Sequence, residues 1–294
     1  MTTLYLVATP IGNLEDITAR ALRILSEVKL IAAEDTRHTR KLLNRYEIET
    51  QVISYHEHNK LARLDMILLT LANGGDVALV SDAGTPAISD PGYELVHAVI
   101  NAGFPVSPIP GACAAIAGLI GSGLSTEQFF YCEFAPRRSS ERQAWFQAVA
   151  AIHATLVCYE APHRIEATLK DALAVLGNRQ AAVARELTKL HEQFVRGTLQ
   201  DLIDYFAVNQ ARGEIVLVIA GAPKADPIRR RIKHELSDEQ HQTSEQPNVD
   251  EATIRHALQT LRDQGMNGSK AAKQVAQQFG VNRQEVYRIW TELA

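Results

Sequence analysis

Short apolar segments alternate with amphipathic ones through the first 120 or so residues, and this alternation restricts the possible folds more than any other feature. Strands are predicted at 3–8, 29–35, 51–55, 76–81 and 105–110, and most are followed by a segment with apolar residues at helical spacing. Strands and helices that alternate across short turns are typical of an α/β domain built on a mainly parallel sheet.

A second alternating unit follows a change of composition at residues 124–144, where aromatic residues and three arginines are mixed. The pattern predicts helices over 142–152, 163–177 and 198–211, and strands over 155–161, 181–188 and 214–221. We expect some antiparallel pairs in this unit, while the order of its strands stays open. The sequence therefore predicts two α/β domains, over residues 1–122 and 123–222.

The chain after residue 222 has a different character. Residues 223–250 are charged and rich in glutamine without an apolar period, which indicates a linker. Residues 251–294 are predicted to form a small helical module that resembles a helix-turn-helix, with Ser269 and Asn282 as N-caps. Ten basic and ten acidic residues from position 226 onward give it no basic excess, so packing or assembly and RNA contact are both open roles.

Composition indicates a compartment but no activity. The net charge of −4 is weak evidence against a nucleic-acid binder, because binding depends on local patches. The three cysteines lack metal-ligand or CxxC spacing, and the N-terminus lacks the basic start of a signal peptide. The longest apolar run, at 112–124, is too short and too rich in glycine to span a bilayer. We therefore expect a reduced, cytoplasmic protein.

Three loops that follow predicted strands are candidates for a ligand site: ATPIGN (8–13), SDAGTPAISDPG (81–92) and PIPGACAA (108–115). Ligands of α/β sheets gather at the carboxyl ends of strands, and glycine there lets the backbone approach them closely. The GxGxxG, GxxxxGK[ST] and GxSxG motifs are absent. YHEHN (55–59) lacks the i, i+4 histidine spacing of a zincin, so no metal site is predicted.

These loops carry a resemblance to a known family. Its motifs also include AAEDTRHTRKLL (32–43), YEAPHR (159–164), RELTKLHE (185–192) and GEIVLVIAG (213–221), and they cover residues 3 to 221 in order. The chain resembles the tetrapyrrole-methylase-like (class III) S-adenosylmethionine methyltransferases, and within them the bacterial group that methylates small-subunit ribosomal RNA. It departs modestly from the usual pattern at CEFAPR (132–137) and at Cys113, and Glu133 leaves substrate contacts in that segment open.

The resemblance implies 2′-O-methylation of a cytidine ribose in the decoding region of 16S rRNA, with S-adenosylmethionine as donor. It also implies a homodimer and a cofactor cleft between the two α/β domains. By the same resemblance, the cofactor-binding residues are Gly84, Thr85, Pro86, Ile88, Ser89, Cys113, Ala114, Tyr159, Glu160, Ala161, Leu187, Glu214 and Ile215.

A ribose hydroxyl is a poor nucleophile, so a base or an orienting group would help. The candidates are His163, Glu186 and Lys189, each of which could instead be structural, and positioning alone could suffice. RNA would need local positive charge, for which the candidates are Arg37, Arg40, Lys41, Arg137, Arg138, Arg142 and Arg164.

Two other functions remain open. A methyltransferase for a small tetrapyrrole-like molecule would share the cofactor loops but would not need the arginines of YEAPHR and APRR. A non-catalytic RNA-binding protein would not need the intact glycines of the loops. The leading hypothesis is the ribosomal RNA methyltransferase, acting on naked 16S rRNA or on the assembled small ribosomal subunit.

Overall fold

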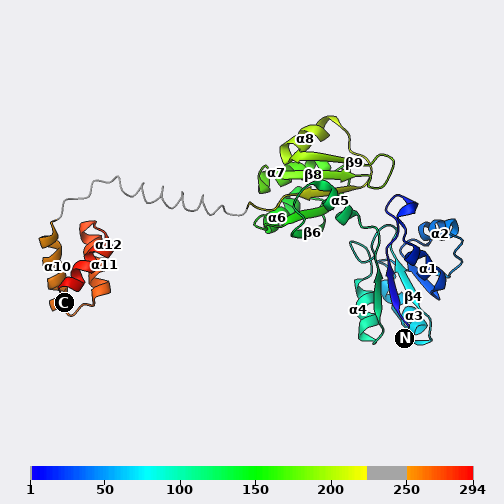
Figure 1. Cartoon of the computed structure of the whole chain (residues 1–294), viewed down its shortest axis with the longest axis horizontal. Helices are drawn as coiled ribbons and strands as arrows, with labels where there is room; N and C mark the ends of the chain where they lie inside the picture. Colours follow the sequence, from blue (N-terminus) through cyan, green and yellow to red (C-terminus); the bar gives the residue numbers. More distant parts are fainter. Residues whose placement is uncertain (1, 224–249, 294) are drawn as a thin grey trace. The chain divides into compact units, whose positions relative to one another are not determined.

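The computed structural model describes residues 2–223 and 250–293, and the chain divides into two units, 1–224 and 225–294. The first unit holds two five-stranded sheets joined through one helix, and the described part of the second holds three helices (Figure 1). The predicted fold class, two α/β domains followed by a helical module, is confirmed.

The first sheet has the order β3-β2-β4-β1-β5, and all its neighbouring strands are parallel. Alternate residues of its strands point to opposite faces: Ile31 contributes to the core beneath α1 and α2, and Leu30 to the core beneath α3 and α4. The strands are β1 (Leu4–Val7), β2 (Leu30–Ala33), β3 (Val52–Ser54), β4 (Val77–Val80) and β5 (Val106–Ile109). The helices are η1 (Leu14–Asp16), α1 (Ala19–Glu27), α2 (Thr36–Arg45), α3 (Lys60–Ala72) and α4 (Tyr93–Asn101).

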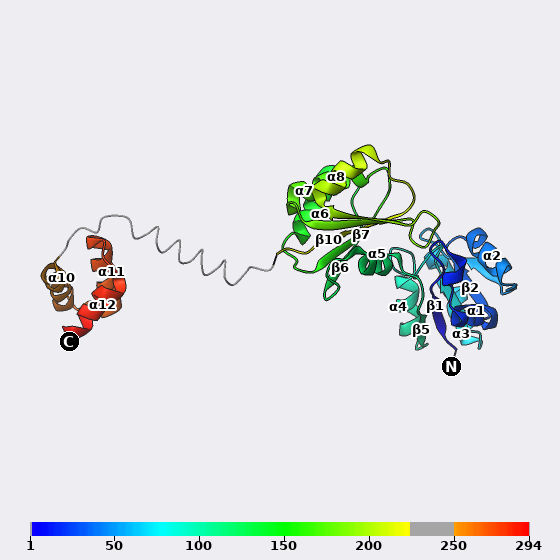
Figure 2. The same cartoon turned by 45° about the horizontal axis from the view of Figure 1, so that its top comes forward.

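The second sheet has the order β6-β7-β10-β8-β9, with β6 and β7 parallel and the other pairs antiparallel, so the expected antiparallel pairs are confirmed. Helices α6, α7 and α8 cover one face, and α5 from the first domain covers the other (Figure 2). The strands are β6 (Phe129–Phe134), β7 (Thr155–Glu160), β8 (Gln180–Arg185), β9 (Gln193–Thr198) and β10 (Ile215–Ile219). The helices are α5 (Ala114–Ser122), α6 (Ser139–Val149), α7 (Ile165–Leu176) and α8 (Leu199–Val208).

Residues 250–293 of the C-terminal unit form a bundle of α10 (Glu251–Asp263), α11 (Gly268–Phe279) and α12 (Arg283–Glu292). Asn282 caps α12 as predicted, since its side chain accepts from the Gln284 N–H. The predicted cap at Ser269 is wrong: Asn267 caps α11 and accepts from the Lys270 N–H, which leaves Ser269 inside the helix. The greater part of the predicted linker, residues 224–249, lies outside the described residues. In the described ranges, no helix combines the length and apolarity needed to cross a bilayer.

One expected RNA contact is part of the core instead. The Arg142 side chain is 4% exposed, and its Nη2 lies 2.5 Å from Asp171 Oδ2. The guanidinium also donates to the carbonyls of Pro136 and Arg137, so it closes the turn that leads into α6. The expectation that Arg142 binds RNA is therefore wrong, because its charge is neutralised inside the second domain.

We predict that Arg142→Met lowers the free energy of unfolding by about 3–5 kcal/mol, because it leaves the Asp171 carboxylate buried without its cation. The matched control is Arg138→Met, in which the lost pair with Glu141 joins two exposed side chains. The control should cost less than about 1 kcal/mol. Urea unfolding of both variants measures the difference, and equal costs would contradict the structural role of Arg142.

Candidate active site

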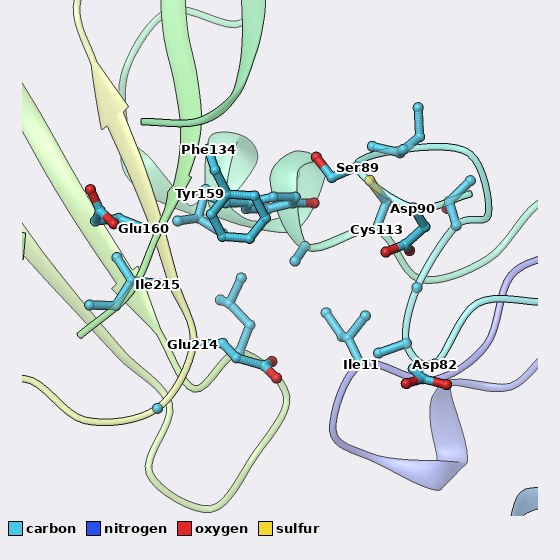
Figure 3. Close-up of a pocket in the computed structure, with 18 of the residues that line it drawn as sticks. Ile11, Asp82, Ser89, Asp90, Cys113, Phe134, Tyr159, Glu160, Glu214 and Ile215 are labelled. Atoms are coloured by element: carbon cyan, nitrogen blue, oxygen red, sulfur yellow. The ribbon is translucent and has the colours of Figure 1, made fainter. Parts of the chain in front are cut away.

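A cavity of about 440 Å³ lies where loops of the first domain face the second sheet, and its size is typical of small-molecule sites (Figure 3). Of the residues predicted to bind a cofactor, all except Pro86 line it; Pro86 is buried within the same loop. The cavity is also lined by residues that the sequence analysis did not select: Ile11, Glu34, Asp82, Ala83, Asp90, Phe134, Pro162, Gly213 and Val216.

The loop from residue 81 to 92 forms much of the first-domain wall. Gly84 exchanges backbone hydrogen bonds with Thr9, of 2.8 and 3.0 Å, and the Thr85 hydroxyl donates to the Ala112 carbonyl at 3.0 Å. The three loops predicted from sequence are thus joined to one another. Gly84 has a φ of +81°, and Ala87 and Ser89 have φ values of +67° and +62°, which side chains rarely adopt. The backbone conformation of this wall is therefore unusual and is held by its contacts.

Aromatic residues form the opposite wall. The Ser89 and Tyr131 hydroxyls lie 2.5 Å apart, and the Ala115 N–H donates to the Tyr159 hydroxyl at 3.2 Å. The rings of Phe134 and Tyr159 have centroids 5.3 Å apart. Burial raises the pKa of both tyrosines, so these phenols stay protonated at neutral pH. Of the two, Tyr159 lines the cavity, and both are poor proton acceptors.

The position of Phe134 depends on an irregularity in β6. The pairing of β6 with β7 shifts register between Tyr131 and Phe134, and Glu133 within this bulge has a φ of +56°. Bulges next to sites commonly redirect a side chain. Here the bulge lets Phe134, which is 54% exposed, line the cavity.

Glu160 and Arg164 of the YEAPHR motif hold the turn after β7. The Glu160 side chain is fully buried, with Oε1 2.9 Å from Arg164 Nε, and it accepts from the Thr168 hydroxyl at 2.5 Å. Arg164 also donates to the Ala135 carbonyl. Arg164, which was expected to contact RNA, therefore has its guanidinium engaged within the protein.

None of the three predicted catalytic residues lines the cavity. Lys189 Nζ lies 3.0 Å from Glu186 Oε1 and 3.4 Å from Glu214 Oε2. The hydrogen bond from Lys189 lowers the pKa of Glu186, which weakens it as a base. His163 is exposed and lines a neighbouring depression together with Phe134 and Arg137.

The remaining predicted RNA contacts are on the surface. Arg40 and Lys41 are exposed on α2, which begins two residues after the cavity-lining Glu34. Arg37 is exposed on the same helix and pairs with Asp35 at 2.7 Å. Arg137 and Arg138 are exposed before α6.

Three carboxyl groups missed by the sequence analysis lie in the cavity wall: Glu34, Asp82 and Asp90. The Asp82 N–H donates to Glu34 Oε2 at 3.4 Å, and the Asp35 N–H donates to Asp82 Oδ1 at 2.9 Å. Burial raises the pKa of Glu34, and burial with the charges of Glu34 and Asp82 raises that of Asp90 to about 6. The quoted motifs contained all three, but the adjacency of β2 and β4 is what brings them together.

Comparison with known proteins identifies a family to which this chain is similar. The family model of the tetrapyrrole (corrin/porphyrin) methylases matches residues 3–203. A ribosomal RNA small subunit methyltransferase I from Synechocystis sp. is 48% identical over 99% of this chain and 98% of its own length. The protein of that name from Bacillus subtilis is 43% identical over 97% of this chain and 92% of its own length.

Solved structures agree in fold. A diphthine synthase superposes with a TM-score of 0.59 at 15% identity, over 81% of this chain and 96% of that one. A uroporphyrin-III-C-methyltransferase from Thermus thermophilus gives a TM-score of 0.53 at 19% identity, over 74% of this chain and 94% of that one. At these identities the likeness concerns the fold alone. Together with the family model and the full-length relatives, it means that this chain belongs to the tetrapyrrole (corrin/porphyrin) methylase family.

Proposed function

We propose that this protein transfers a methyl group from S-adenosylmethionine to the 2′-hydroxyl of a cytidine ribose in the decoding region of 16S rRNA. The observation that carries the proposal is the match over almost the whole chain to proteins named ribosomal RNA small subunit methyltransferase I. The nucleoside, the oxygen and the region follow from the resemblance of the motifs. We further propose that the substrate is the assembled small subunit and that the enzyme works in the cytoplasm.

The cavity fits S-adenosylmethionine, the methyl donor of this family. Its walls combine close-approaching backbone at Gly84, apolar side chains such as Ile11 and Ile215, and carboxyl groups at the Asp82 and Asp90 end. Such a lining suits a molecule with a flat base, polar ribose and a positive sulfonium. When bound, the donor supplies an electrophilic methyl group. The protein's part is then to hold the two reactants in line and to exclude water.

We propose that RNA lies along the exposed cations of α2, with Arg137 and Arg138 as further contacts. The position of α2 supports this, because the helix starts at the carboxyl end of β2, where Glu34 lines the cavity. RNA phosphates held there would be near the donor site. Sequence-independent contacts of this kind weaken as salt rises.

We also propose a homodimer. Ile116 and Ile120 of α5 are 41% and 69% exposed, and Phe129 and Phe130 of the edge strand β6 are 46% and 44% exposed. Figure 2 places α5 and β6 next to each other. Exposed apolar side chains gathered on adjacent elements commonly mark an interface, and a second copy of the chain would cover them.

The proposed function is tested by incubating the protein and labelled S-adenosylmethionine with 30S particles and with protein-free 16S rRNA, each from cells that lack the enzyme. We expect alkali-resistant label on one ribose of the decoding region, with more label from the particle. Label in RNA at a base, or none in RNA while the donor still binds, would contradict the proposal. The second result would favour a small tetrapyrrole-like acceptor.

Gly84→Ala should weaken binding of S-adenosylhomocysteine about tenfold or more, which corresponds to about 1.4 kcal/mol. The added Cβ would lie 3.2 Å from Ile11 Cγ2 at a φ of +81°, so the cavity wall must shift. Gly103→Ala is the control: its φ of +80° carries the same backbone strain, but no atom lies within 4 Å of the added Cβ. Calorimetry on both variants decides the point. Equal affinities would argue against a cofactor wall at Gly84.

Arg40→Glu should weaken binding of the small subunit about tenfold and reduce the salt dependence of binding, while S-adenosylhomocysteine binds as before. The reason is that reversing an exposed charge on α2 would repel RNA phosphates. Lys170→Glu is a charge-reversal control on α7, where Lys170 pairs with Glu166 at 2.6 Å. Binding measured at several salt concentrations checks this. An effect of Lys170→Glu as large as that of Arg40→Glu would contradict the proposal that RNA binds along α2.

A further inference from the structure

The acidic end of the cavity is built from strand ends that are neighbours in the sheet but distant in sequence. Glu34 follows β2 and Asp82 follows β4, which pairs with β2, while Asp90 comes from the far side of the loop after β4. All three line the same cavity as the proposed cofactor residues. Figure 3 labels two of them, Asp82 and Asp90. They therefore belong to the place where donor and acceptor must meet.

These carboxyl groups have no basic partner within ion-pair distance in the described part of the chain, unlike the other acids nearby. Glu160 is paired with Arg164, Glu214 with Lys189, and Asp35 with Arg37. The charged groups that face the cluster are Asp35, with Arg37 beside it, and His56 beyond Glu34 after β3. The cluster thus keeps a free capacity to accept a proton or a positive charge.

Asp90 is the member of the cluster best placed to accept a proton. Asp82 accepts from the Asp35 N–H, and Glu34 from the Asp82 N–H. The group beside Asp90 is the Ser81 hydroxyl, which also lies 3.3 Å from the Ala83 carbonyl. Ser89, which precedes Asp90 in the chain, is hydrogen-bonded to Tyr131 of β6, and this bond fixes the end of the loop. Burial, together with the negative charges of Glu34 and Asp82, raises the pKa of Asp90 to about 6. Asp90 is therefore ionised at neutral pH yet more basic than an exposed aspartate.

The other titratable groups near the cavity are less suited to this task. The pKa values of Tyr131 and Tyr159 are raised by burial, so both remain protonated. Glu160 is buried in its ion pair. Glu186 and Lys189 are bonded to each other outside the lining, and among the described residues no group of three acids, histidines or cysteines is arranged to hold a metal.

We propose that the Asp90 carboxylate is the general base that removes the proton of the acceptor hydroxyl, with Glu34 and Asp82 as its positioning neighbours. This inference rests on the proposed function. As the new oxygen–carbon bond forms, the carbon–sulfur bond breaks and its electron pair stays on sulfur. The hydroxyl proton passes to Asp90, which later releases it to water. The donor's positive charge is consumed, and no other reactant is needed.

The test compares Asp90→Asn, Asp90→Glu and the wild type in single-turnover methylation of 30S particles, with S-adenosylhomocysteine binding measured by calorimetry. We expect Asp90→Asn to lower the methylation rate about 10²- to 10⁴-fold, the usual contribution of a general base. Binding of S-adenosylhomocysteine should stay within about threefold of wild type, which shows that the site is folded. Asp90→Glu should recover part of the rate. Asp65→Asn, at an exposed position of α3, is the control and should behave as wild type.

The pH profile gives a second test that needs no variant. The wild-type rate should rise through an acidic limb near pH 6, because Asp90 accepts a proton only when ionised. A profile that is flat from about pH 5 to 8 would overturn the proposal.

Two further results would also overturn it. One is a full methylation rate in Asp90→Asn. The other is that Asp90→Asn loses affinity only for the positively charged ligands S-adenosylmethionine and sinefungin, and methylates at the normal rate when the donor is saturating. That result would make Asp90 a charge partner of the donor. If the wild type transfers no methyl group to small-subunit RNA, the proposed function itself falls and the inference falls with it. Methylation at equal rates by the wild type and Asp90→Asn would remove the inference alone.

Discussion

The close packing of α5 on the second sheet is the contact on which the rest of the first unit depends. A Cβ on Gly118 would lie 2.7 Å from Val216 Cγ1, and one on Gly121 would collide with the Phe194 ring. Only glycine lets the helix backbone approach the sheet this closely. Because Cys113 and Ala114 begin this helix and Val216 lies on β10, the same contact brings both walls of the cavity together.

Several residues beside the cavity have a strained backbone conformation. Ala87 and Ser89 in the loop, and Glu133 in the β6 bulge, have positive φ values, and each such residue costs about 1–2 kcal/mol. The Ser89–Tyr131 hydrogen bond helps to hold the conformation at Ser89. Strain of this kind commonly collects at ligand sites, where a precise shape matters.

The alternating fold could be predicted because the apolar periodicity of most strands and helices is strong. The strands without such periodicity were not predicted. β6 and β9 are edge strands with few buried side chains, so Phe129–Phe134 and Gln193–Thr198 carry little periodic signal. The residues proposed to bind the cofactor could be selected because short motifs carry them. The burial of Arg142 could not be foreseen, since its partner Asp171 lies 29 residues away on another helix. The acids of the cavity could not be predicted as a group without the order of the strands in the sheet, which local sequence does not encode.

The charged residues in and around the cavity affect which part of an RNA can enter it. Among the residues that the structure describes, no cation pairs with the acids at the end of the cavity, while the exposed cations of α2 begin just outside it. On the proposed function, RNA phosphates are attracted to the helix and repelled from the cavity, because like charges at short range repel each other. A neutral ribose edge meets no such barrier. The field therefore favours presenting a hydroxyl, not a phosphate, to the donor, and it does so before any base is recognised.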